Sequence, residues 1–103
     1  MSSSFFLLDR FLARQEFSSY EDFQAHFRVH VPANFNFACD VVDVLAERQP
    51  EARALVWCDD HGNAASFTFR QVRDESLRAA RVFADHGVRK GDAVMLILKR
   101  RYE

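Results

Sequence analysis

The sequence has little of what marks a secreted, zinc-binding or nucleic-acid-binding protein. Its two cysteines, Cys39 and Cys58, form no CxxC pair and no cysteine–histidine cluster with zinc spacing. No feature marks a base for either thiol, so we interpret both as core residues that stay reduced in a cytoplasmic protein. The net charge is -1 with acids and bases interspersed, which gives no electrostatic basis for nucleic-acid binding.

Long apolar runs are missing as well. The N-terminal stretch MSSSFFLLDRFLARQ has no basic region, and Asp9 and Arg10 interrupt its apolar run, so it does not resemble a signal peptide. No stretch approaches the length that a membrane-spanning helix needs. The sequence also contains no repeat, no low-complexity tract and no flexible linker. We therefore expect one globular segment without a membrane span.

Phenylalanine, in contrast, is abundant and unevenly placed. Eight of the eleven phenylalanines precede residue 40, namely Phe5, Phe6, Phe11, Phe17, Phe23, Phe27, Phe35 and Phe37. A chain of 103 residues has room for one domain at most and for a modest core. It cannot easily bury that many rings, so we expect an exposed apolar surface that packs on a larger partner or self-associates.

Helical patterns fill the first half of the chain. Residues 4–15 have apolar side chains at 3–4 spacing and predict an amphipathic helix. Ser18-x-x-Glu21 is a capping box, which predicts a second helix that begins near Ser18 and ends before Pro32. A third helix is predicted over residues 37–48.

The second half alternates strands and a helix. Two β-rich runs, 54–58 and 66–69, flank a turn and predict a hairpin. A second capping box, Thr68-x-x-Gln71, opens a predicted helix over 69–86, and the glycine that follows suits the left-handed position after a helix. The continuous apolar run 93–98 predicts a further strand covered on both faces. The fold class expected is α/β, with N-terminal helices, a β-hairpin, a long helix and one further strand.

Two polar patterns could carry a metal or acid–base chemistry. His26 and His30 are four residues apart on the predicted second helix, with Asp22 one turn earlier, a pattern that could hold a metal. No third histidine and no Glu-x-x-His motif supports it, so a solvated helix face is favoured. The carboxylate pairs Asp40/Asp43 and Asp59/Asp60 lack any sign of burial, so no acid–base role is predicted.

Two basic stretches could contact an anion. The stretch VRKGD at 88–92 contains glycine and lysine, but a phosphate-binding P-loop runs from strand to helix, and here the order is reversed. We interpret it as a turn. Lys99, Arg100 and Arg101 follow the predicted strand, where an anionic ligand could bind, but a solvated strand exit is favoured.

Four short motifs follow one another along residues 31–103. They are VPANFNF at 31–37, ALVW at 54–57 before the hairpin turn, FTF at 67–69 opening the long helix, and GVRKGD at 87–92 before the last strand. In this order and spacing they resemble the start of an AMP-forming acyl-CoA synthetase. More narrowly, they resemble the medium-chain and acetyl-CoA synthetase branch of the adenylate-forming superfamily. Residues 1–30 resemble the variable, helical N-terminal extension of that branch.

This resemblance implies a fold, an activity and a set of cofactors. Residues 31–103 would start the large N-terminal AMP-binding domain, incomplete here. The whole enzyme would activate a short- or medium-chain fatty acid with ATP and Mg²⁺ to an acyl-adenylate, and would then transfer the acyl group to coenzyme A.

The parts of such an enzyme that carry the chemistry follow Glu103 in the family. They are the phosphate-binding loop, the acyl pocket, the adenine motif, the ribose-binding aspartate, and the C-terminal domain with its catalytic lysine. No catalytic, cofactor-binding or metal residue can therefore be assigned to this sequence, and Arg100 is the nearest approach to one. We expect a scaffold segment, inactive alone, whose partner is the remainder of the synthetase chain. A stand-alone interaction or dimerisation module is the alternative.

Overall fold

A computed structural model describes the backbone of residues 5–103, and side chains from residue 7 onward. The predicted helix start at residue 4, and the rings of Phe5 and Phe6, lie outside this described part. The chain divides into two compact units, Met1–Asn36 and Phe37–Glu103. The domain division predicted at residue 31 stays a prediction.

The first helix of the N-terminal unit is shorter than its apolar pattern suggests. Helix α1 spans Phe5–Phe11, whereas the pattern predicted a helix to residue 15. The chain leaves the helix because Leu12 forms an isolated antiparallel bridge with Val29, and the His30 N–H donates to the Phe11 carbonyl at 2.7 Å. A long-range backbone pairing therefore replaces the last helical turn.

The second helix, α2, spans Tyr20–His26, and its cap lies one residue later than predicted. The Ser19 hydroxyl, not that of Ser18, accepts the Asp22 N–H at 3.1 Å. Ser18 instead donates its N–H and its hydroxyl to the Asp22 carboxylate, at 2.9 and 3.0 Å. Both serines thus form hydrogen bonds with Asp22. The N-cap is Ser19 rather than Ser18, so the free N–H groups at the start of the helix are capped one residue later than the predicted capping box.

An aromatic cluster explains why α2 ends well before Pro32. Phe27 already has an extended backbone, with φ -65° and ψ 122°. This geometry allows its ring to lie 6.4 Å from Phe17 and 4.8 Å from Phe23 between centroids, while Phe17 and Phe23 are 5.2 Å apart in an edge-to-face pair. The three rings contact one another within the unit, and such contacts stabilise beyond area burial alone.

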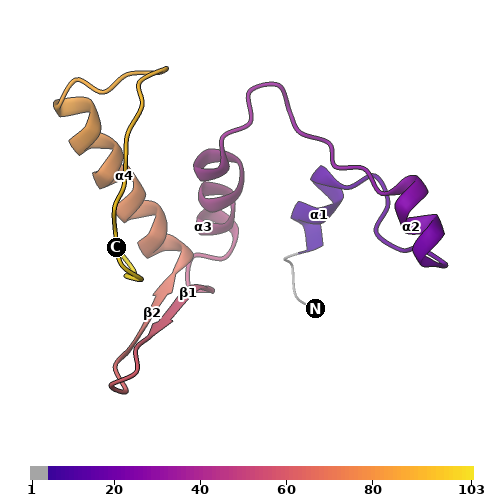
Figure 1. Ribbon diagram of the computed structural model, residues 1–103, viewed down its shortest axis with the longest axis horizontal. Coiled ribbons are helices and arrows are strands. Elements are labelled where there is room, and N and C mark those ends of the chain that lie inside the picture. The colour runs from indigo at the N-terminus through magenta and orange to yellow at the C-terminus, as the bar shows by residue number, and fades with distance from the viewer. Residues whose placement is uncertain (1–4) are drawn as a thin grey trace. The chain divides into compact units, whose positions relative to one another are not determined.

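The second unit contains the small core. The helix predicted over 37–48 is present, but its first part, Ala38–Asp43, is π-helical and only Val44–Arg48, labelled α3, is α-helical. Val42, Leu45 and Ala46 are the buried hydrophobic residues of the described chain, with exposed fractions of 9%, 7% and 2%. This one helical segment therefore supplies all of them, and the long helix α4, Phe69–Asp85, packs on it (Figure 1).

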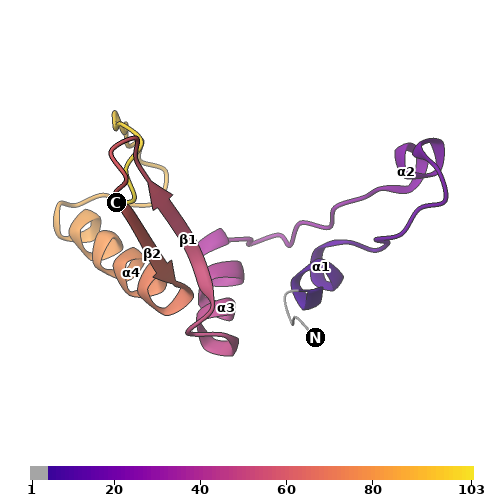
Figure 2. The ribbon, with the colours of Figure 1, turned by 90° about the horizontal axis from the view of Figure 1, so that it is seen from below.

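The predicted β-hairpin is confirmed. Strands β1, Arg53–Cys58, and β2, Ala64–Thr68, pair antiparallel, as Figure 2 shows. The Asp59 carboxylate holds the turn by accepting the N–H groups of His61 at 2.9 Å and Asn63 at 2.8 Å. Gly62 lies in the left-handed region at φ +84°, which only glycine adopts at little cost. The two strands form the sheet of the described residues.

Helix α4 begins at Phe69, as the sequence predicts, and ends at Asp85, one residue before the predicted end. The capping box is complete: the Thr68 N–H donates to the Gln71 side chain at 2.8 Å, and the Gln71 N–H donates to the Thr68 hydroxyl at 3.3 Å. At the other end Gly87 has φ +80°, and the N–H groups of Gly87 and Val88 each bond a last-turn carbonyl at 3.0 Å. This is a Schellman motif, in which the helix carbonyls find partners after the helix has ended.

The strand predicted over residues 93–98 is wrong for this structure. These residues are extended but belong to no sheet, and Figure 1 shows them as an irregular trace. A strand is defined by hydrogen bonds to a neighbour, and the hairpin pairs only with itself among the described residues. Without a neighbouring strand, the apolar run stays at the surface, where Met95 is 84% and Ile97 87% exposed.

Candidate functional site

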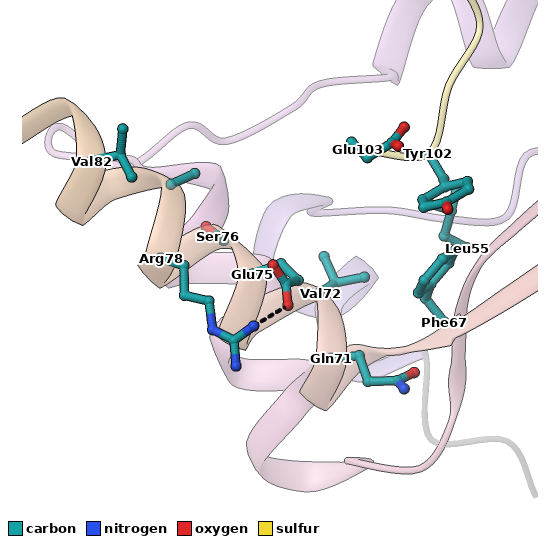
Figure 3. Close-up of a pocket in the computed structure, with 11 residues that line it drawn as sticks. Leu55, Phe67, Gln71, Val72, Glu75, Ser76, Arg78, Val82, Tyr102 and Glu103 are labelled. Carbon is teal, nitrogen blue, oxygen red and sulfur yellow. Dashed lines mark hydrogen bonds and ion pairs between the residues drawn. The ribbon is translucent and has the colours of Figure 1, made fainter.

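An open groove of about 670 Å³ lies between the hairpin, α4 and the C-terminal residues (Figure 3). The hairpin contributes apolar side chains on one side, and α4 contributes a mixed face on the other. The main apolar residues that line the groove are Leu55, Phe67, Val72, Ala79, Val82 and Tyr102. The groove is therefore mainly apolar, and its polar groups lie on α4 and at the C-terminus.

Local sequence positions the α4 side of the groove. The capping box sets where the helix begins, and Gln71 from that box lines the groove. One turn later Glu75 and Arg78 form an ion pair at 2.7 Å, drawn in Figure 3. Both side chains are more than half exposed, at 67% and 75%. Exposed pairs of this kind add little stability, so this pair mainly neutralises charge on this side of the groove.

Tyr102 closes the opposite side. Its ring lies edge-to-face with Trp57, 5.4 Å between centroids, and tilted against Phe67 at 5.0 Å. The Trp57 indole N–H donates to the Arg100 carbonyl at 3.3 Å. These three contacts attach the C-terminal residues to the hairpin, and we call Trp57, Phe67, Arg100 and Tyr102 the aromatic clasp.

The Arg101 guanidinium makes two hydrogen bonds to the Glu103 carboxylate beside the clasp, at 2.9 and 2.7 Å. The side-chain hydrogen bonds from Arg101 lower the pKa of Glu103 to about 2. Glu103 is therefore anionic at physiological pH and already paired. Because Arg101 is paired, residues 99–101 do not act as one cationic patch. These residues were predicted to follow a strand, and this is wrong because residues 93–98 form none.

Replacing Tyr102 with alanine should open the clasp. Trp57 is the single tryptophan of the chain, so its fluorescence reports this region alone. We expect a red shift and stronger acrylamide quenching, because the indole loses an aromatic neighbour and gains water. Tyr20→Ala is the matched control, since Tyr20 is 70% exposed and makes no ring contact with Trp57. Identical spectra for Tyr102→Ala and the unaltered chain would contradict the clasp.

The histidine pattern predicted for a metal is not brought together. His26 is the last residue of α2, and His30 follows in extended chain, so the two do not share a helical face. His26 instead contacts the Asp22 carboxylate through Nδ1 at 2.7 Å. That carboxylate also makes two hydrogen bonds with Arg14, at 2.9 and 2.7 Å. Among residues 5–103, no three His, Cys, Asp or Glu side chains gather as a metal site would require.

The carboxylate pairs that were considered for acid–base chemistry belong to a helical segment and to the hairpin turn. Asp40 and Asp43 lie in the π-helical segment, and Asp59 caps the hairpin turn. Hydrogen bonding from the Asn63 side chain is the main reason why the pKa of Asp59 is lowered. This keeps Asp59 an acceptor rather than an acid.

The two cysteines were predicted to lie in the core, and this is wrong. Cys39 and Cys58 are both exposed free thiols. The core consists of one turn and a half of helix, so Cys39 on its outer side and Cys58 at the end of the hairpin strand fall outside it. The general preference of cysteine for buried positions predicts burial only where the core is large enough to include the residue.

The stretch 88–92 is a turn, as predicted. The Arg89 N–H donates to the Asp92 carboxylate at 2.7 Å, and the Asp92 N–H donates to the Arg89 carbonyl at 3.0 Å. Gly91 permits the turn at φ +95°. Both backbone N–H groups are thus used inside the turn and do not point at an anion.

The described groove holds no pairing of a nucleophile with a base. Its acids are Glu75 and Glu103, each already paired with an arginine. Sequence reasoning missed both the groove and the clasp. Tyr102 carried no signal, because only the folded chain brings residue 102 to residues 57 and 67. The groove is an open, mainly apolar surface whose acidic groups are paired.

Comparison with known proteins decides the family. The family model described as AMP-binding enzyme matches residues 42–103, which include the three buried core residues, the hairpin, α4 and the clasp. The chain belongs to the AMP-binding enzyme family. The resemblance to AMP-forming acyl-CoA synthetases noted from the four motifs is thereby confirmed.

Relatives of this AMP-binding chain are acyl-coenzyme A synthetases. It is 30% identical over 92 residues to the mitochondrial acyl-coenzyme A synthetase ACSM3 of Homo sapiens, covering 84% of this chain and 16% of that protein. It is 37% identical over 75 residues to the mitochondrial ACSM1 of Mus musculus, covering 67% and 13%. The chain thus spans about a sixth of the length of the curated relatives it matches.

Proposed function

We propose that this chain is a scaffold segment of an AMP-forming acyl-CoA ligase. The observation that carries the proposal is the family match over 42–103 together with relatives named acyl-coenzyme A synthetases. The enzyme would join a short- or medium-chain carboxylic acid to coenzyme A through an acyl-adenylate. Within it, residues 1–30 would be the helical extension and residues 31–103 the start of the AMP-binding domain.

ATP, Mg²⁺ and coenzyme A would be bound by other parts of that enzyme. The described residues do not fit such groups: the acids of the groove are paired, and the backbone N–H groups of the turn at Arg89 and Asp92 are used internally. We therefore assign no catalytic, cofactor or metal residue to this chain. Its role is to present the apolar groove between the hairpin and α4 to the remainder of a synthetase chain.

A chimera tests the proposal. The segment of human ACSM3 that aligns with residues 31–103 is replaced by these residues, and CoA thioester formation is measured with acetate, butyrate, octanoate and palmitate. We expect the chimera to retain activity on the acids that ACSM3 accepts, because the segment supplies scaffold rather than chemistry. A soluble, folded chimera without activity would contradict the proposal.

Two control experiments distinguish a scaffold role of this segment from a role in binding or catalysis. Arg100→Ala in the chimera should leave activity within about twofold, because the Arg100 carbonyl, not its side chain, holds the clasp. A loss of two orders of magnitude with intact folding would place a functional residue here. The 103-residue chain alone should show no acid-dependent ATP–pyrophosphate exchange, and any exchange above background would overturn the scaffold role.

The compartment is part of the same proposal. The two exposed thiols without a disulfide suit a reducing compartment, and we propose the cytoplasm. The relatives carry the word mitochondrial in their names. None of the helices in residues 5–103 has the length and apolar character needed to cross a bilayer. Fractionation of source cells, with detection of residues 31–103, separates the two locations.

A further inference from the structure

We draw no further inference here: the strongest candidate, the open apolar groove between the hairpin, α4 and the C-terminal residues, belongs to the site already described, and nothing in the structure shows what covers it.

Discussion

Replacing Leu45 with alanine is expected to abolish the cooperative unfolding transition of the second unit. Leu45 is 7% exposed and lies between the other two buried residues, Val42 and Ala46. Truncating a buried leucine costs about 2–5 kcal/mol. A core of this size supplies only about 3–5 kcal/mol in total, so most of the stability is removed. Circular dichroism during thermal and urea unfolding measures the change.

Leu77→Ala is the control for this result. Leu77 is the same residue type in helix α4 but is 58% exposed, and substitutions at such positions usually change stability by less than about 0.5 kcal/mol. Equal effects of the two substitutions would show that the described core does not hold the unit together. A Leu45→Ala chain with an unchanged midpoint would show the same.

Replacing Asp22 with asparagine is expected to release the segment between α1 and α2. The Asp22 carboxylate, whose side chain is 15% exposed, accepts hydrogen bonds from Arg14, Ser18 and His26 together. Asparagine has one acceptor oxygen and presents an amide donor to the arginine. Trypsin should therefore cleave after Arg14 faster in Asp22→Asn than in the unaltered chain, by roughly tenfold or more.

The same carboxylate predicts a pH dependence with a definite sign. The pKa of Asp22 is lowered from its ordinary 3.8, first by the hydrogen bond from the Ser18 N–H and also by those from Arg14, the Ser18 hydroxyl and His26. A lowered folded-state pKa means that the stabilisation is present above 3.8 and is lost as the pH falls further, through the folded-state value. Amide exchange of Ser18, followed by NMR as the pH decreases, should show that protection of this N–H is lost only below pH 3.8.

Glu21→Gln and the Asp22→Asn chain are the controls for these two experiments. Glu21 is also in the first turn of α2 but is exposed, so Glu21→Gln should leave cleavage at Arg14 unchanged. Asp22→Asn should lack the acid step in Ser18 protection. An acid step of the same size in Asp22→Asn would assign the transition to another group.

The elements that sequence reasoning predicted correctly are those that a few neighbouring residues decide. The box of Thr68 and Gln71 begins α4, and Gly87 ends it, because capping bonds join residues three to five positions apart. The hairpin follows for the same reason, since Asp59 and Gly62 make its turn inside five residues. The family resemblance also rested on these local motifs, and the match over 42–103 contains three of the four in full.

Where the predictions failed, contacts between distant residues had decided the outcome. The bridge of Leu12 to Val29 shortened α1, and the contact of Phe17 with Phe27 ended α2. The run 93–98 has every local property of a buried strand, yet it forms none, because a strand needs hydrogen bonds from a neighbour that no local pattern supplies. The sequence by itself determined the ends of α4, the turns and the family of this protein. Only the tertiary structure decided which side chains are buried, because burial depends on contacts between residues that are distant in the sequence.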